Sequence, residues 1–149
     1  MKDVLKIMDQ DHEELAVLFI QFLVYLNSSS EKSKTIFDQL KKNLYRHFQW
    51  EEKILFPLLE EQGGPPASDI TFVIKNEHIQ IKTMFIGKIE HLLKEKNYSE
   101  ILNLTVGLEE MLTMHRKYEN DIFYPWFDES LDEVEKKKVL ELLKRKNNK

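Results

Sequence analysis

Apolar residues recur at spacings of three and four residues along four long stretches of the chain. In an α-helix this spacing gathers the apolar side chains on one face, so the pattern predicts four amphipathic helices. A shorter helix with an apolar face that can dock on the others is predicted near the C-terminus. The sequence therefore predicts an all-α protein. The expected helices cover approximately residues 3–25, 31–61, 68–96, 99–126 and 131–146.

The ends of these helices carry recognisable signals. Ser30 and Ser68 are expected to cap the second and third helices, because a serine hydroxyl can accept a hydrogen bond from a free backbone N–H. Ser130, followed three residues later by Glu133, has the pattern of a capping box and is expected to open the last helix. Pro57 lacks an N–H, so the second helix should bend or loosen near its end, beyond the polar residues that it carries.

A break at residues 62–66, which read Gln-Gly-Gly-Pro-Pro, divides the chain into two similar halves, 1–62 and 67–127. Neither pair of helices could cover its own apolar face, so we expect a single domain over residues 1–149. A chain of 149 residues is large enough to bury a core. Glycine and proline are scarce, at four each, which favours long helices over a turn-rich β fold.

Charge and cysteine usage narrow the class of protein. The formal net charge of −4 gives no electrostatic basis for binding nucleic acid or an anionic membrane. The apolar run 16–26 is too short to span a membrane, and the residues before it are acidic where a signal peptide would be basic. The absence of cysteine excludes disulfides, thiolate ligands and a cysteine nucleophile, and it fits a cytoplasmic protein.

Polar residues interrupt the apolar faces in a repeated pattern. His47 and Glu51 lie four residues apart, so they sit one turn apart on the same face of the second helix. The fourth helix repeats this pair as His115 and Glu119. Both pairs stand in segments that match along their length, HFQWEEKILFP and HRKYENDIFYP. A repeated His-x-x-x-Glu pair is a stronger signal of shared chemistry than either pair alone.

Each half also carries one histidine on its first helix. Together the two halves supply four histidines and two glutamates, which is the ligand count of a two-metal site between four helices. Imidazole and carboxylate together suit iron, manganese or zinc. Coordination would also remove the cost of burying these groups in apolar faces. The candidate metal ligands are His12, His47, Glu51, His78, His115 and Glu119.

Each part of this pattern has a simpler interpretation when it is taken alone. A single histidine in an apolar face is more often a hydrogen-bonded core residue than a ligand, and a single glutamate is more often solvated. The recurrence of all the ligand types in a matched repeat favours a metal site. A structural zinc site is the main rival interpretation. A ferritin-like oxidase is disfavoured, because its signature is Glu-x-x-His rather than His-x-x-x-Glu.

The ligand types suggest how two metal ions would be held. Glu51 and Glu119 are expected to bridge them, because a carboxylate has two oxygens, and the four histidines are expected to be terminal ligands. This set leaves each of two iron ions short of six ligands. Oxygen, nitric oxide, azide or water could bind at the open positions, often with an oxo or hydroxo bridge between the iron ions.

Other residues near the pattern are not expected to be ligands. His91 is expected to be exposed, because it lies about 220° around the helix from His78. Glu52 is expected to support a ligand or to lie at the surface, since its counterpart in the second segment is Asn120. Several nearby aromatic residues could screen the site or carry radicals, but core packing is their commoner role. They are Tyr45, Trp50, Tyr118 and Trp126.

With these residues the chain resembles the hemerythrin-like family, the HHE cation-binding domains. The resemblance covers nearly the whole chain, from DHEEL around His12 and EH at Glu77 and His78 to the two matched segments. It implies an up-down-up-down four-helix bundle around a non-haem di-iron centre, to which the short C-terminal helix predicted above would be an addition.

Two features separate the chain from the oxygen-carrying hemerythrins. Those proteins have a fifth histidine in an HxxxH pair on the third helix, whereas positions four residues either side of His78 are Ile74 and Lys82 here. They also use an aspartate five residues after the last histidine, where this chain has Asn120. The four-His, two-Glu set is more similar to the di-iron proteins linked to nitric oxide stress and to repair of iron–sulfur centres. Those proteins usually carry an N-terminal cysteine-containing segment, and this sequence has no cysteine.

The sequence therefore favours a non-haem di-iron protein that binds or reduces oxygen, nitric oxide or peroxide, in the response to oxidative or nitrosative stress. An iron or oxygen sensor and an iron-delivery protein, neither of which turns over a substrate, are the alternatives. Whether the chain is an enzyme stays open. The expected cofactor is two iron ions, although other divalent metals suit the same donors. The expected partners are a small diatomic ligand and an unidentified redox partner, and we expect a monomer or a weak oligomer.

Overall fold

The computed structural model describes residues 3–147, and within this range every element is helical and no strand is present. This confirms the prediction of an all-α protein. The α-helices are α1 (Asp3–Leu26), α2 (Ser30–Trp50), α3 (Phe56–Gln62), α4 (Pro65–Gln80), α5 (Gly87–Glu95), α6 (Tyr98–Tyr118), α7 (Tyr124–Ser130) and α8 (Glu133–Asn147). Three π-helical segments join some of them, namely η1 (Glu51–Leu55), η2 (Ile81–Ile86) and η3 (Glu119–Phe123).

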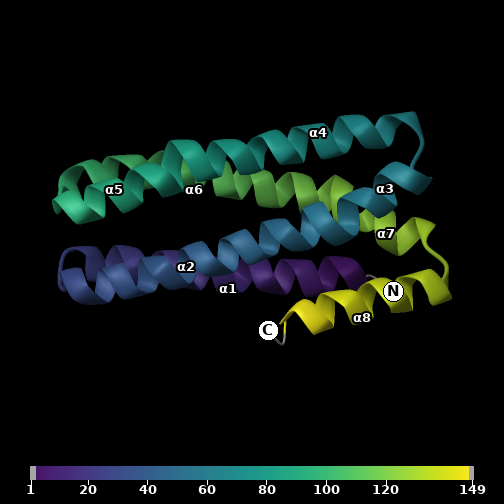
Figure 1. Ribbon diagram of the computed structural model, residues 1–149, viewed down its shortest axis with the longest axis horizontal. Coiled ribbons are helices and arrows are strands. Elements are labelled where there is room, and N and C mark those ends of the chain that lie inside the picture. The colour runs from purple at the N-terminus through teal and green to yellow at the C-terminus, as the bar shows by residue number, and fades with distance from the viewer. Residues whose placement is uncertain (1–2, 148–149) are drawn as a thin grey trace.

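The helices are arranged as long rods that lie side by side (Figure 1). α1 forms the first rod, and each of the other three consists of an α-helix, a π-helical segment and a second α-helix. In Figure 1, α1 lies behind α2, and α6 lies behind α4 and α5. α8 turns back from the end of α7 and packs against α1 and η1. None of the helices formed by residues 3–147 is long and apolar enough to cross a membrane.

One π-helical segment, η1, lies near the end of the second rod, the part of the second helix that the sequence predicted would loosen. In η1 the N–H of Phe56 bonds to the carbonyl of Glu51, five residues earlier, and Pro57 follows directly. η3 is built in the same way before Pro125. A proline cannot donate to the preceding turn and its ring crowds that turn, so a widened turn accommodates it. The widened turn begins at Glu51 itself, and not beyond the polar residues as the sequence suggested.

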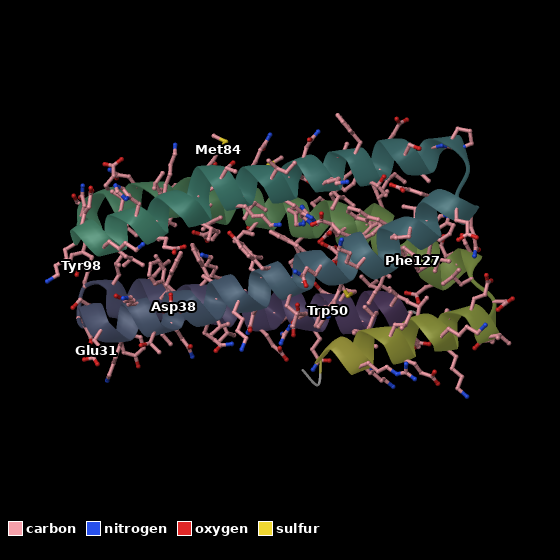
Figure 2. The ribbon with its side chains drawn as sticks, viewed as in Figure 1. Glu31, Asp38, Trp50, Met84, Tyr98 and Phe127 are labelled. Atoms are coloured by element: carbon pink, nitrogen blue, oxygen red, sulfur yellow. The ribbon has the colours of Figure 1, made fainter. Side chains whose placement is uncertain are left out.

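The core consists of two apolar clusters, one toward each end of the rods. One contains Phe127 and the other packs against Tyr98, and Figure 2 shows these two residues at opposite ends of the molecule. Along α1, Met8 belongs to the first cluster and Leu15 to the second. Buried polar residues occupy the layer between the clusters on every rod. The apolar clusters therefore enclose a polar layer near the middle of the bundle.

Several predicted helix ends were wrong in detail. Ser29, and not Ser30, caps α2, because its hydroxyl accepts a hydrogen bond from the N–H of Lys32. α4 begins at Pro65, which the sequence had placed in the loop, so Ser68 lies inside the helix. Gly64 precedes α4 with a φ of 74°, a conformation that a residue without a Cβ adopts at little cost.

The last helix begins with a capping box, but at a different position from the predicted one. The N–H of Glu135 donates to Asp132 Oδ1 at 2.8 Å, and the N–H of Asp132 donates to Glu135 Oε1 at 3.2 Å. Asp132 and Glu135 therefore play the roles that the sequence assigned to Ser130 and Glu133. Val139 and Leu143 of α8 are buried, so this helix docks on the bundle through an apolar face, whereas Val134 and Leu142 are exposed.

Candidate metal centre

All six predicted ligand residues meet in the polar layer between the two apolar clusters. They come from every rod: His12 from α1, His47 and Glu51 from α2 and η1, His78 from α4, and His115 and Glu119 from α6 and η3. Each is buried, with at most 7% of its surface exposed. The apolar residues on either side therefore hold six titratable groups together, away from water.

The donor atoms of these residues form two groups. One group is Glu51, His78, His115 and Glu119, and the other is His12, His47 and Glu119. Within each group the donor atoms lie within 4.8 Å of one another. Glu119 belongs to both groups, so its carboxylate lies between them.

Contacts between the two halves of the chain hold the carboxylates in place. His12 Nε2 of the first half lies 3.0 Å from Glu119 Oε1 of the second half. His78 Nε2 of the second half lies 3.0 Å from Glu51 Oε1 of the first half. Each first-helix histidine therefore contacts the glutamate of the opposite half, which the sequence repeat alone did not reveal.

In each of the four candidate-ligand histidines, ring nitrogen Nδ1 faces a carboxylate. A protonated Nδ1 at these distances donates to that oxygen, which fixes the ring and leaves Nε2 directed at the cluster. Histidines that bind metals in proteins are commonly held in this way. The pairs are His12 with Asp9 at 3.3 Å, His47 with Asp11 at 2.7 Å, His78 with Glu52 at 3.1 Å and His115 with Glu77 at 3.1 Å.

The sequence analysis found only one of these four supporting carboxylates. Glu52 supports His78, one of the two roles expected of it. Asp11 and Glu77 were missed, although each directly precedes a histidine and the repeat thus contained the signal. His91 is exposed as predicted, with 70% of its side-chain surface accessible.

Tyr124 is a further member of the site that sequence reasoning missed. Its hydroxyl donates to Glu51 Oε2 at 2.7 Å and lies 3.0 Å from Glu119 Oε1. The same oxygen lies 3.1 Å from His47 Nε2 and 3.3 Å from His12 Nε2. The phenol therefore contacts members of both donor groups.

Comparison with known proteins agrees with this geometry. The family model of the hemerythrin HHE cation-binding domain matches residues 3–143. The chain belongs to this family. Searches of curated proteins and of solved structures gave no match. The family and the buried His/Glu cluster together indicate that this hemerythrin HHE domain binds metal, typically iron.

The histidines of this hemerythrin HHE domain differ in their affinity for protons. Burial lowers the pKa of His47, but the charge of Glu51 and the hydrogen bond to Asp11 outweigh burial and raise that pKa to about 10. For His115, the charge of Glu119 likewise outweighs burial and raises the pKa well above its ordinary value. Without a metal, these two imidazoles therefore carry protons at neutral pH.

The two central carboxylates are pushed in opposite directions. Burial and the charge of Glu119 raise the pKa of Glu51 to about 7. Burial would also raise the pKa of Glu119, but the charge of His115 and hydrogen bonds hold it well below its ordinary value. The metal-free cluster thus keeps one firmly charged carboxylate, the one shared by both donor groups.

The donor set leaves two buried atoms that a metal ion would satisfy. His115 Nε2 lies 3.2 Å from Glu119 Oε1 but forms no hydrogen bond, and Glu119 Oε2 also has no hydrogen-bonding partner. Buried polar atoms are rarely left unpaired, because each one costs roughly 1–3 kcal/mol. Both atoms belong to the group that also contains Glu51 and His78. The residues present therefore fit a metal ion.

Proposed function

We propose that this chain is a non-haem di-iron protein that binds or reduces a small molecule, either oxygen, nitric oxide or peroxide. His78 and His115 would hold one iron, and His12 and His47 would hold the other. Glu119 would join the two ions, and Glu51 would assist it. The observation that carries the proposal is the pair of buried donor groups that share Glu119.

The donor types favour iron over softer metals. The groups offer imidazole nitrogen and carboxylate oxygen, and the chain has no cysteine. Such a donor set suits iron, manganese and zinc, and iron is the typical metal of this family. Members of the family bind small ligands such as oxygen. The donor types therefore support iron as the bound metal, and the family supports a small molecule as its ligand.

The two donor groups differ in the number of residues that they provide. The group of His12 and His47 has three members, one fewer than the group of His78 and His115. The ion held by the smaller group would have more open coordination positions. We therefore propose that the small ligand binds to this ion. When bound, iron would supply the electrons and the coordination position that such a ligand requires.

The chain's own residues would control protons around the added ligand. The Tyr124 hydroxyl stands within hydrogen-bonding distance of both carboxylates; burial and their charges raise its pKa well above the ordinary value, so it stays protonated and can donate a hydrogen bond there. The carboxylates of Asp11 and Glu77 would keep the Nδ1 protons of His47 and His115 in place. The surrounding apolar clusters would limit entry of water.

An anaerobic titration of the metal-free protein with ferrous ion tests this proposal. We expect the titration curve to show a break at two ferrous ions per chain. Admission of oxygen should then produce the visible bands of an oxidised di-iron centre. A reversible coloured adduct would identify binding, whereas immediate irreversible oxidation would identify reduction of oxygen. If the binding curve shows no break and no colour develops, the proposal is contradicted and a structural zinc site becomes the favoured interpretation.

The wider biological setting follows from the same proposal. We propose the up-down-up-down order of the four rods, a role in oxidative or nitrosative stress, and a cytoplasmic location, all as predicted from the sequence. An unidentified redox partner and a monomeric or weakly oligomeric state also stay predictions. Measurement of nitric oxide binding to the ferrous protein would test the role in nitrosative stress. A protein that does not bind nitric oxide would contradict that role.

A further inference from the structure

A pocket of about 180 Å³ leads from the molecular surface to the histidine cluster. It lies between α1, α2 and α6, and its inner end is formed by His12, His47 and His115. The pocket therefore connects solvent with both histidines of the smaller donor group and with His115 of the larger one.

The walls of this pocket are apolar over most of their depth. Leu15 and Phe19 of α1 face Leu44 and Phe48 of α2, and Leu112 of α6 closes the third side. All of these except Leu112 are buried, and Leu112 is partly buried. Such walls favour an apolar occupant, because they offer no hydrogen bonds to replace those that a polar molecule loses on leaving water.

The charged residue nearest the cluster is already engaged. Arg116 lines the pocket, but its Nε donates to Asp9 Oδ1 at 2.7 Å and its Nη2 lies 3.9 Å from Glu13. The other charged lining residue that is not a histidine, Glu109, is exposed at the mouth beside Ala16. The three lining histidines also face carboxylates, so the lining residues offer no unpaired cation to hold an anionic ligand.

The pocket is far larger than a diatomic molecule requires. A single water-sized molecule needs roughly 10–15 Å³ on the same measure of volume, and an apolar cavity of about 150 Å³ engineered in another protein holds benzene. A cavity of about 180 Å³ thus has room for a ring with a small substituent. Its size and its walls point to an organic occupant rather than to a passage for gas alone.

We propose that this pocket binds a small, uncharged, mainly apolar organic molecule of about the size of a substituted benzene. One end of the molecule would lie against His12 and His47, and the other would reach the mouth between Ala16 and Glu109. The placement of this molecule beside a metal ion rests on the proposed function. The pocket itself depends only on residues of the chain, so binding can be measured with or without metal.

Toluene is a suitable probe, and its binding can be followed by NMR of labelled leucine methyl groups in the full chain. We expect a saturable one-to-one shift of the methyl signals of Leu44 and Leu112, in both the metal-free and the zinc-loaded protein. The signals of Leu143, which belongs to the other core cluster, should stay unchanged. No saturable shift up to the solubility of toluene, or equal shifts at Leu143, would overturn the proposal.

Adjacent residues on α1 provide a matched pair of variants. Ala16→Phe would place a ring in the mouth of the pocket, and we expect it to weaken toluene binding by at least about tenfold. Val17→Phe adds a similar ring at an exposed position outside the pocket and should change binding by less than about twofold. Leu112→Phe fills the pocket from α6 and should also weaken toluene binding. This variant provides the test if Ala16→Phe fails to fold. Wild-type affinity in a folded pocket-filling variant would overturn the proposal.

The test distinguishes this inference from the proposed function. A chain that takes up two iron ions but no toluene would contradict the pocket proposal alone. A chain that binds toluene but takes up no iron would contradict the di-iron proposal and leave the pocket established.

Discussion

Each candidate ligand depends on a second residue that holds it in position. The shortest of these supporting contacts joins His47 Nδ1 to Asp11 Oδ2 at 2.7 Å, and both residues are buried. Arg46 Nη2 lies 3.5 Å from the other carboxylate oxygen of Asp11 and helps to hold this side chain in place. Replacement of such a supporting group typically weakens metal binding without removing any ligand.

Asp11→Asn should therefore lower the affinity for metal by about 10–100-fold, because a neutral amide holds the His47 ring less firmly and lowers its basicity. Competition against a chelator of known affinity measures the change. Asp121→Asn is the matched control, since Asp121 is exposed and contacts Lys117 rather than a ligand. Equal affinities for Asp11→Asn and the wild type would contradict the supporting role.

The candidate ligands were predictable residue by residue because they recur in a repeat, whereas Tyr124 was not. The counterpart of Tyr124 in the first segment is Phe56, so an aromatic residue at that position indicated only core packing. Phe56 does lie stacked against His78, at 6.0 Å between ring centroids. The hydroxyl that separates the two residues chemically becomes informative only when the fold places it between Glu51 and Glu119.

A second asymmetry explains why Asp9 was also missed. Glu52 supports His78, but its counterpart in the second segment is Asn120, whose neutral amide lacks the negative charge of a carboxylate. Asn120 instead donates to Asp9 Oδ1 at 2.8 Å, and Asp9 supports His12. Burial would raise the pKa of Asp9, but hydrogen bonds from Arg116 and Asn120 lower it to about 2, so the carboxylate stays charged. The first segment of the sequence repeat has no counterpart of this pair of contacts to Asp9.

At the scale of elements, the helix ranges followed from the spacing of apolar residues, but the helix ends did not. Serine and asparagine near an end are all plausible caps, and the choice among Ser28, Ser29 and Ser30 depends on the backbone conformation of the turn. The turn places the Ser29 hydroxyl 3.2 Å from the N–H of Lys32. Ile122 continues the apolar spacing of the fourth helix but is exposed, since it lies in the π-helical turn η3, which changes the register of the helix face.

The end of α5 gives a prediction at this scale. Lys96 follows α5 with a φ of 59°, a left-handed conformation that costs a residue with a Cβ about 1 kcal/mol. Lys96→Gly should therefore raise the free energy of unfolding by about that amount. Urea unfolding at matched metal content measures it.

Lys94→Gly serves as the opposite control for this prediction. Lys94 lies within α5, where glycine is expected to lower stability by about 1 kcal/mol relative to a good helix former. Opposite shifts of the urea midpoint in the two variants support the assignment of Lys96 as the left-handed end of α5. A lower midpoint in both variants would contradict it.

At the scale of the whole molecule, the bundle encloses a charged layer between two apolar clusters. Such a layer stabilises the fold only when its charges are balanced, by protons on the histidines or by metal ions. The metal-free and metal-loaded proteins should therefore respond differently to pH, because different cations balance Glu51 and Glu119 in the two forms.

The raised pKa of His47 sets the direction of this difference. In the metal-free chain that pKa is about 10, above the ordinary value of 6.5, so the folded state binds the proton more tightly than the unfolded state. The resulting stability is full below about pH 6.5 and is lost as the pH rises through about 10. We expect thermal midpoints of the metal-free protein to fall over that range.

In the metal-loaded protein, Nε2 of His47 would hold a metal ion instead of a proton, and this fall should be absent. The stability gap between the two forms is thus expected to widen from neutral to alkaline pH. Thermal midpoints measured in parallel on the two forms test the difference. A parallel decline in both forms would show that the pKa of His47 is unrelated to metal binding.

The central claim is that two metal ions share the carboxylate of Glu119, and the metal content of one matched pair of variants tests it most directly. Wild-type protein and Glu109→Ala, which changes an exposed glutamate on α6 in the same rod, should each hold two iron ions per chain. Glu119→Ala should hold no more than one. Two tightly bound ions in folded Glu119→Ala, or none in the wild type, would contradict the account.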